Sequence, residues 1–181
     1  MNAALPKLLP GLVLDVPRTF RDARGAFREV WNADRAPVQA LPAAFVQVNH
    51  STSVRDTVRG LHFQRRHPQG KLVSVVYGAI WDVAVDLRPG SPTLGQHCAV
   101  ELSVENGRQL YLPPGFAHGF CALSDRADVI YLTTERYQPE DEAAIRWDDA
   151  ALAIAWPLTG PARLSPKDAA APPFAAVDFT L

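Results

Sequence analysis

Apolar residues recur at every second position in several short segments of the chain. In AFVQVNHSTS, residues 44–53, Gln47 and Asn49 share one face, and Val46 and Val48 share the other. The same alternation occurs in KLVSVVYGAIWDVAVDLR, HCAVELSV, RQLYLPP, GFCAL and DVIYLTTERY. A period of two is typical of β-strands. Prolines and glycines separate these segments, so the sequence predicts an antiparallel sandwich or barrel of short strands.

Signals for helix are weak by comparison. We expect residues 71–88 to form two strands hinged near Tyr77 and Gly78. Residues 139–156, PEDEAAIRWDDAALAIAW, predict a turn or two of helix, and the proline-rich stretch from Pro157 predicts loop with one late element. Internal repeats and low-complexity linkers are absent from the sequence, which favours a single domain over residues 1–181.

Composition narrows the classes of function. The 181 residues are 48% hydrophobic and 20% charged, as in an ordinary globular domain. The formal net charge of −1 gives no global attraction to nucleic acid or to an anionic membrane, so an anion site needs a local basic cluster. Cys98 and Cys121 lie outside any CxxC motif, and the N-terminal segment is interrupted by Pro6 and Pro10 without a signal-peptide pattern. We therefore expect a cytoplasmic protein with two buried thiols.

The polar face of residues 44–53 has two interpretations. It meets solvent, as the polar face of a half-buried strand usually does. Alternatively, Gln47 and Asn49 project with Lys71 and Asp82 from neighbouring strands into a polar barrel interior, where a ligand or a complete hydrogen-bond network must satisfy them.

The basic stretch RGLHFQRRHPQGK, residues 59–71, raises the question of a metal site. A metal-binding barrel of this kind needs two imidazoles two residues apart, but Gln64 follows His62 at that spacing. His62 and a later His118 alone leave an ion under-coordinated, so we expect no metal. The remaining histidines, His50, His67 and His97, are expected to be exposed or structural. Three cations favour phosphate binding instead: Arg24, Arg59 and Lys71.

A set of ordered motifs from about Gly11 to about Asp168 resembles the dTDP-4-dehydrorhamnose 3,5-epimerase family of nucleotide-sugar enzymes. The motifs are FRDARGAFREVWN, FVQVNHSTS, RGLHFQ, QGKLVSVVYGAIWDVAVDLR, SPTLG, QLYLPPGFAHGF, DVIYLTTERYQPEDE and RWDD. The resemblance implies an all-β, cupin-type jelly-roll barrel of antiparallel strands with minor helical turns. It also implies a homodimer that epimerises a dTDP-4-keto-6-deoxy sugar at C3 and C5 without metal or cofactor.

The same resemblance implies roles for individual residues. His62 is the general base, Asp168 orients its imidazole, and Asp82 belongs to the same network. Lys71 faces the 4-oxygen of the sugar, and Tyr131 delivers a proton to the opposite face. The substrate-binding positions, with the arginines serving the diphosphate and two aromatic residues packing on nucleotide or sugar, are Phe20, Arg24, Glu29, Gln47, Asn49, Arg59, His118, Tyr137, Glu142 and Lys167.

The chemistry of epimerisation independently calls for these residue types. A ketone at C4 acidifies the hydrogens at C3 and C5, so a base of near-neutral pKa forms an enolate if a cation stabilises its oxygen. Inversion then needs an acid on the other face, and a phenol remains protonated until it is needed.

Alternatives remain at this point. The first is a mono-epimerase that acts at C3 or C5 only. The others are a sugar-sensing cupin without catalysis and a metal-dependent oxygenase. Ser74, where the family often has arginine, and residues 32–42, NADRAPVQALP, depart from the family pattern.

Overall fold

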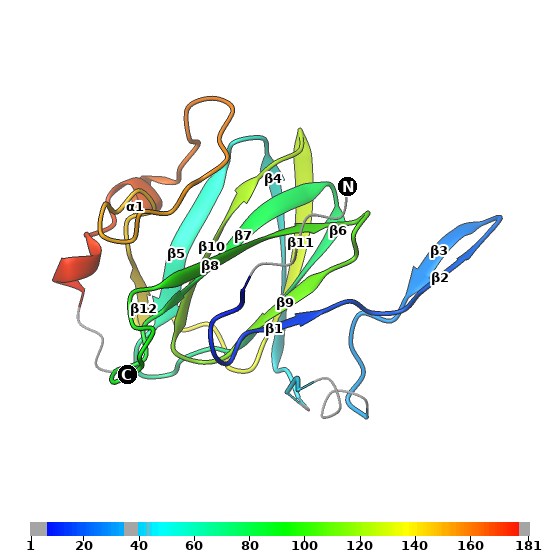
Figure 1. Cartoon of the computed structure of the whole chain (residues 1–181), viewed down its shortest axis with the longest axis horizontal. Helices are drawn as coiled ribbons and strands as arrows, with labels where there is room; N and C mark the ends of the chain where they lie inside the picture. The colour runs from blue at the N-terminus through cyan, green and yellow to red at the C-terminus, as the bar shows by residue number, and fades with distance from the viewer. Residues whose placement is uncertain (1–6, 35–39, 43, 178–181) are drawn as a thin grey trace.

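The computed structural model describes residues 7–34, 40–42 and 44–177, and it consists of two five-stranded antiparallel sheets packed face to face (Figure 1). Sheet I has the order β1 (Val13–Asp15), β9 (Gln109–Leu112), β6 (Lys71–Tyr77), β11 (Arg126–Thr133) and β4 (Gln47–Val54). Sheet II has the order β12 (Glu142–Ala144), β5 (Val58–Gln64), β10 (Phe116–Ala122), β7 (Ala79–Asp86) and β8 (His97–Ser103). The predicted all-β architecture is confirmed, including the hinge at Gly78 between β6 and β7.

The main core lies between the two sheets. Inward-facing residues of β6, such as Val73 and Val75, pack with Ile80 and Ala84 of β7 and with Phe120 of β10. This packing removes apolar side chains from water at one end of the sandwich, while the other end keeps the polar cavity described below.

The chain also covers the outer faces of both sheets in part. The C-terminal segment packs Ile145, Leu152 and Val177 against the outer face of sheet II, next to Leu61 and Val83. A smaller cluster covers the outer face of sheet I, and it comprises Leu41, Leu72 and Tyr111 with Val13, Trp31, Phe45 and Leu132. The apolar contacts with sheet II hold the C-terminal segment next to the cavity.

Strand β4 has its valine face outward and its polar face inward. Val48 is 64% exposed, whereas Gln47 and Asn49 line the cavity between the sheets. The structure thus supports the second interpretation of this strand, a polar interior. Its details differ from the expectation, because β11 separates β4 from Lys71 on β6, and Asp82 lies on β7 of the opposite sheet.

The turn or two of helix predicted for residues 139–156 is wrong. This stretch instead contains β12, which pairs with β5 from Glu142↔Gln64 to Ala144↔His62, followed by turns. The late element is confirmed as two short pieces, α1 (Pro166–Ala169) and the 3-10 helix η1 (Phe174–Ala176). Within the ranges that the structure describes, neither helix nor any other has the length and apolarity to cross a membrane.

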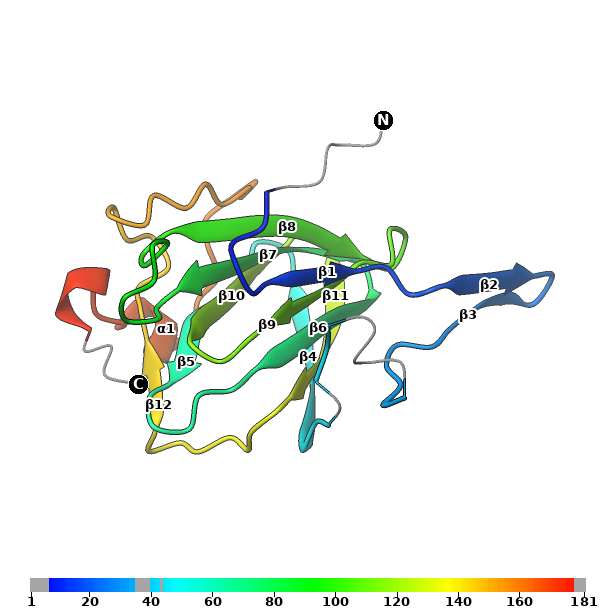
Figure 2. The same ribbon diagram turned by 60° about the horizontal axis from the view of Figure 1, so that its bottom comes forward.

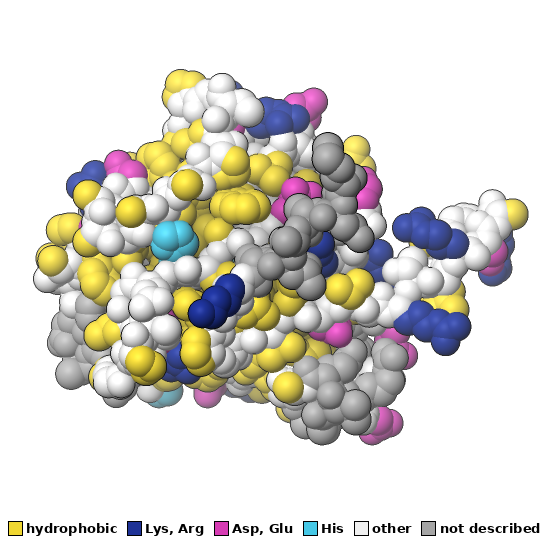
Figure 3. Space-filling model, in the orientation of Figure 1, with side chains coloured by type: hydrophobic (Ala, Val, Ile, Leu, Met, Phe, Trp, Pro, Cys, Tyr) yellow, Lys and Arg dark blue, Asp and Glu magenta, His cyan; other side chains and the backbone are white. Residues whose placement is uncertain are grey.

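A separate β-hairpin, which we call the arm, projects away from the sandwich (Figures 1 and 2). It consists of β2 (Thr19–Asp22) and β3 (Gly25–Arg28), which pair with each other and with neither five-stranded sheet. An isolated two-stranded hairpin is at best marginally stable in water. The arm nevertheless presents Phe27 with 66% exposure, together with basic side chains along its length (Figure 3).

Candidate active site

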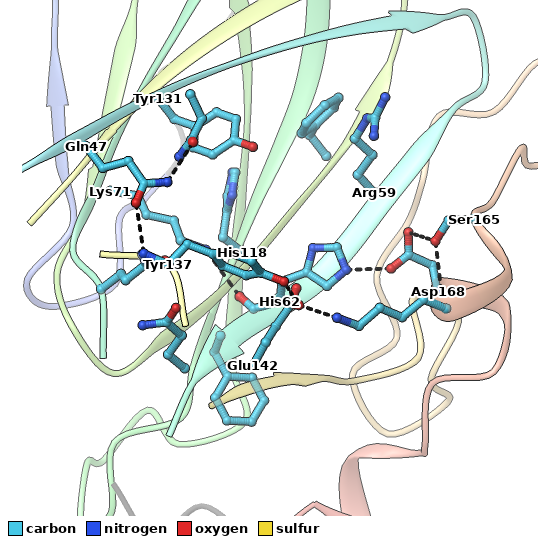
Figure 4. Close-up of a pocket in the computed structure, with 16 residues that line it drawn as sticks. Gln47, Arg59, His62, Lys71, His118, Tyr131, Tyr137, Glu142, Ser165 and Asp168 are labelled. Carbon is cyan, nitrogen blue, oxygen red and sulfur yellow. Dashed lines mark hydrogen bonds and ion pairs between the residues drawn. The ribbon is translucent and has the colours of Figure 1, made fainter. Parts of the chain in front are cut away.

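A cavity of about 420 Å³ opens between the two sheets, and most of its lining is polar (Figure 4). Its size falls within the range of small-molecule sites. The lining residues come from both sheets, from the loop after β11 and from α1: Gln47, Asn49, Arg59, His62, Phe63, Gln64, Gln69, Lys71, His118, Phe120, Tyr131, Tyr137, Glu142, Ser165, Lys167 and Asp168. Most of the site residues predicted from the sequence therefore lie together in one cavity.

His62 on β5 forms a pair with Asp168 of α1. Its Nε2 lies 2.5 Å from Asp168 Oδ1, and the imidazole keeps 28% exposure towards the cavity. Burial raises the pKa of Asp168, but its hydrogen bonds with His62 and Ser165 outweigh this effect and the pKa lies below its usual range. An ionised Asp168 fixes the ring and stabilises imidazolium, which leaves the second ring nitrogen of His62 for proton transfer.

Ser165 is a member of this site that the sequence analysis missed. It caps the N-terminus of α1, because its hydroxyl accepts a hydrogen bond from the Asp168 backbone N–H at 3.0 Å and donates one to Asp168 Oδ2 at 2.9 Å. The signal was present as Ser-Pro-Lys-Asp, a cap residue followed by proline and an acidic residue.

Asp82 does not join the His62 network, contrary to the expectation. Its Oδ1 lies 2.7 Å from Nε2 of His118, and both side chains are nearly fully buried in sheet II. They belong to β7 and β10, which are adjacent strands. Two separate histidine–aspartate pairs therefore have an imidazole that lines the cavity, and of these two His62–Asp168 has the more exposed imidazole.

Lys71 at the start of β6 extends across the barrel to β5. Its Nζ lies 3.5 Å from the backbone oxygen of His62, so the ammonium group and the imidazole share one region of the cavity. Burial lowers the pKa of Lys71 to about 8, although the charges of Glu142 and Asp82 act in the opposite direction. At neutral pH Lys71 is a buried cation that can stabilise a developing oxyanion.

Tyr131 enters the cavity from β11 of sheet I, whereas His62 enters from β5 of sheet II (Figure 4). Burial raises the pKa of the Tyr131 phenol, which the charge of Arg59 partly offsets. The phenol therefore stays protonated at neutral pH. An imidazole and a phenol thus project into one cavity from opposite sheets, an arrangement that can serve as base and acid.

Tyr137, Glu142 and Lys167 form a chain of polar contacts beside the cavity. The Tyr137 hydroxyl donates to Glu142 Oε2 at 2.6 Å, and Lys167 Nζ forms an ion pair with the same oxygen. The hydrogen bond to Glu142 and, to a lesser degree, burial raise the pKa of Tyr137 to about 12. Burial raises the pKa of Glu142, but the hydrogen bonds from Lys167 and Tyr137 outweigh this effect. The pKa of Glu142 therefore lies below its usual value, and the carboxylate is ionised at neutral pH.

Two strand residues hold further polar groups of the cavity in place. Gln47 Nε2 donates to Asn49 Oδ1 at 2.8 Å, and its Oε1 accepts from the Tyr137 backbone N–H at 2.9 Å. Arg59 donates from Nε to Ser53 Oγ at 3.0 Å and from Nη2 to the Thr52 backbone oxygen at 3.1 Å. These bonds fix the side chains before any ligand binds.

Three of the predicted substrate-binding residues lie away from this cavity. Phe20 and Arg24 belong to the arm, and Glu29 follows it directly. The Arg24 side chain is 90% exposed, and its Nη2 pairs with Asp22 Oδ2 at 2.5 Å. Within one chain, the arm therefore does not contribute to the cavity of the sandwich.

The other predicted sites have simple outcomes. His67 Nδ1 lies 3.3 Å from Asp141, a structural contact, and the His50 side chain is 55% exposed, as expected. Both cysteines are buried free thiols. Among the residues with described positions, no group of three or more His, Cys, Asp and Glu side chains could hold a metal ion.

Comparison with known proteins gives a consistent result. The model of the dTDP-4-dehydrorhamnose 3,5-epimerase family matches residues 6–176. The chain is 49% identical over 172 residues to the enzyme of that name from Pseudomonas aeruginosa, covering 94% of each chain. It is also 44% identical over 154 residues to a dTDP-4-dehydrorhamnose 3-epimerase from Streptomyces niveus, covering 84% of this chain and 74% of the relative.

A solved structure matches the fold as well. The dTDP-6-deoxy-D-glucose-3,5-epimerase of Legionella pneumophila, crystallised in complex with dTDP-4-keto-L-rhamnose, superposes with a TM-score of 0.92 at 46% identity. The match covers 95% of this chain and 92% of the other. This likeness confirms the predicted jelly-roll fold class.

Proposed function

The chain belongs to the dTDP-4-dehydrorhamnose 3,5-epimerase family, and from this premise we propose how its cavity performs the reaction. The substrate is dTDP-4-dehydro-6-deoxy-D-glucose, and inversion at C3 and C5 gives dTDP-4-dehydro-L-rhamnose. The sugar lies between the two sheets, with its C4 oxygen at Lys71 and its ring between His62 and Tyr131.

In the first step, His62 removes the proton from C3 or C5. The electron pair of the broken C–H bond moves into the ring to form an enolate, and the negative charge develops on the C4 oxygen. The Lys71 ammonium stabilises this oxygen, and Asp168 stabilises the imidazolium that His62 becomes.

In the second step, Tyr131 donates its phenolic proton to the same carbon from the opposite face of the ring. The carbon is inverted because the proton left towards one wall of the cavity and arrives from the other. His62 and Tyr131 then exchange protons with solvent, and the sequence repeats at the second carbon. The observation that carries this proposal is the placement of base and acid on facing sheets.

The test is exchange in deuterated water, followed by NMR of the C3 and C5 protons. Wild-type enzyme is expected to exchange both positions and to form the inverted product. The Tyr131→Phe variant, shown by thermal melting to be folded, should retain exchange while inversion drops by about 10² or more, since only the phenolic proton is lost. Equal losses of exchange and inversion would contradict the acid role of Tyr131.

The same spectra separate the mono-epimerase alternative. A mono-epimerase would exchange and invert only one of the two carbons.

Complete activity after exhaustive chelation is expected as well, because Lys71 supplies the counter-charge that a metal would otherwise provide. Activity that is lost with EDTA and regained with one divalent ion would contradict metal independence.

We further propose that the active enzyme is a homodimer in which the arm of each subunit completes the cavity of its partner. The arm is supported by no other strand, yet it presents an exposed aromatic residue and exposed Arg24. The outer face of β4 offers an apolar surface for the contact, with Val48 64% and Val54 54% exposed. In the partner's cavity, Arg24 would then meet the diphosphate, Phe20 would pack on the nucleotide or sugar, and Glu29 would complete the substrate contacts.

Mixing two inactive variants tests this arrangement. His62→Ala lacks the base, and the double variant Phe20→Ala/Arg24→Ala lacks the arm contacts. If arms act across the dimer, half of the subunits pair with the other variant, and one site in each such dimer is intact, which restores about a quarter of wild-type activity. An arm that acts within its own chain would restore none.

The two buried free thiols fit a reducing compartment, and we propose a cytoplasmic location.

A further inference from the structure

Three consecutive residues at the cavity, Arg136 to Gln138, have their backbone held by two glutamine side chains from opposite sheets. Gln64 of β5 donates from Nε2 to the Arg136 oxygen at 3.2 Å and accepts from the Gln138 N–H at 2.8 Å. Gln47 of β4 accepts from the Tyr137 N–H at 2.9 Å. The segment that carries Tyr137 is thus fixed from both walls of the barrel.

Gln64 is fully occupied by these contacts. It is 3% exposed, and its Nε2 also donates to the His67 oxygen at 2.7 Å, so both amide hydrogens and the amide oxygen are hydrogen-bonded within the protein. A buried amide is stabilising only when its partners are present. Although Gln64 lines the cavity two residues after the base, its polar atoms serve the loop after β11.

The consequence of this arrangement falls on Tyr137. Its backbone is held on both flanks, and its hydroxyl is held by Glu142 at 2.6 Å, but its side chain remains 47% exposed at the cavity. An aromatic ring fixed at both ends loses little conformational freedom when a ligand packs on it.

We propose that Gln64 is a positioning residue, which acts on substrate binding by fixing Tyr137 before the sugar nucleotide arrives. The inference rests on the proposed function, because it takes Tyr137 as a substrate contact. Gln64 itself does not touch the substrate, and its effect is transmitted through residues 136–138. The loss of Gln64 is therefore expected to weaken binding while the proton-transfer groups keep their places.

The first experiment compares Gln64→Met with wild type. Methionine keeps the length and most of the volume of glutamine and removes all three hydrogen bonds. We expect KM for the dTDP-sugar to rise about tenfold while kcat changes less than about threefold. In a Tyr137→Ala background, Gln64→Met should raise KM no further, because the ring that it positions is gone.

Gln109→Met is the matched control. Gln109 is equally buried, at 2% exposure, and it donates to Ser74 Oγ at 2.6 Å on the outer face of sheet I, away from the cavity. Its replacement should lower the melting temperature without changing KM. A purely structural role for Gln64 would instead make the two methionine variants alike.

Gln64→Glu gives an independent readout if the methionine variant is poorly folded. When ionised, the new carboxylate faces two backbone oxygens and repels them, whereas the protonated carboxyl donates to one of them and still accepts from Gln138. Burial at this position raises the pKa of the new carboxyl above that of a free glutamate, so KM of this variant should fall towards the wild-type value as the pH is lowered through that pKa.

The outcomes separate this inference from the proposed function. Wild-type enzyme without turnover would overturn the proposed function, and this inference with it. Active wild type with an unchanged KM in Gln64→Met, or with an equal KM increase in the Tyr137→Ala background, would overturn the positioning role alone. A pH-independent KM in Gln64→Glu would do the same.

Discussion

The pairs His62–Asp168 and His118–Asp82 have the same two side chains at similar separations, 2.5 Å and 2.7 Å, but different surroundings. His118 and Asp82 lie on adjacent strands of sheet II and are almost completely buried. The His62 imidazole is 28% exposed, and its aspartate comes from α1, outside the sheets. A carboxylate partner therefore does not by itself identify the base. The exposure of the imidazole distinguishes the two pairs, and the proposed base is the more exposed one.

The two carboxylates differ in their own support as well. Asp168 Oδ2 accepts from Ser165, and the Asp168 backbone is tied into the cap of α1. Asp82 Oδ2 is buried without a hydrogen-bond partner in the described structure. Lys71 interacts with both pairs, because its Nζ lies 3.5 Å from the His62 backbone oxygen and the charge of Asp82 raises its pKa. The charge of Asp82 thus favours the cationic form of Lys71, and the more exposed pair is the one that we propose for proton transfer.

The largest expected difference between the pairs is in exchange rate. His62→Ala should lower exchange at both C3 and C5 by about 10³ or more, because one base serves both carbons. His118→Ala should leave exchange within about tenfold of wild type and act mainly on KM. NMR in deuterated water measures both variants. The assignment would be reversed if His118→Ala removed exchange and His62→Ala retained it.

Replacing the carboxylates sharpens the comparison. Asp168→Asn should lower exchange by about 10², because the amide no longer stabilises imidazolium, while the melting temperature changes little. Asp82→Ala should act on stability instead, since it leaves the buried His118 nitrogen unpaired at a loss of about 1–3 kcal/mol in the free energy of unfolding. Denaturant unfolding and exchange rates, measured on both variants, test whether the two effects separate in this way.

Lys71 predicts a loss of activity at alkaline pH. In the proposed mechanism, only the protonated form of Lys71 stabilises the enolate, and burial lowers the pKa of Lys71 to about 8. Activity should be retained below pH 8 and fall about tenfold per pH unit well above it. Lys71→Arg, which stays charged, should lower the rate but move this loss of activity to higher pH. A loss near pH 8 in both proteins would assign it to another group.

The lowered pKa of Lys71 also affects stability, and here the trend is opposite to that of activity: stability rises with pH where activity falls. An exposed lysine in the unfolded chain holds its proton up to about pH 10.5, so between about 8 and 10.5 the unfolded state binds more protons than the folded state. The contribution of Lys71 to the free energy of unfolding therefore rises with pH in this window. Lys71→Met should be inactive but more stable than wild type at pH 7, on the order of 3 kcal/mol from the displaced pKa.

The smallest expected effect is at the support of the exposed pair. Ser165→Ala removes the cap of α1 and the bond to Asp168, so exchange should fall about threefold to tenfold, in line with about 1 kcal/mol for a helix cap. Ser53→Ala tests a second position, because it removes one of the two hydrogen bonds that hold Arg59. Ser51→Ala on the same strand is its control, since the Ser51 hydroxyl has no partner in the described structure. Only Ser53→Ala should raise KM.

Much of the fold could be predicted from the sequence, because apolar and polar residues alternate within each strand and this pattern is local. The partner of Asp82 could not, since it depends on β7 pairing with β10 in a register that places Phe120 opposite Asp82 and His118 diagonal to it. Residues 139–156 were misread for a related reason. Alanine and acidic residues favour helix in isolation, but Ala143 and Ile145 are buried against β5, which imposes an extended conformation.

Some features of the candidate site could likewise be predicted from the sequence, and others could not. The residue types of His62, Lys71 and Tyr131 follow from enolate chemistry, while their roles and Asp168 were inferred through the family resemblance. Contacts such as those of Gln64 and Ser165 involve backbone groups of distant segments, which the pattern of side chains along the chain does not reveal. The position of the arm outside the cavity of its own chain was equally invisible to the sequence.

The separation of the two pairs along the chain has a consequence for folding. His118 and Asp82 are 36 residues apart on neighbouring strands, so their contact forms as sheet II assembles. His62 and Asp168 are 106 residues apart, and their contact must wait until the C-terminal segment docks on a finished sheet. Because long loops close late and the contacts they make follow the local ones, refolding protein should recover its β-sheet circular dichroism before its turnover. The pair that we propose as the catalytic base is thus expected to form last.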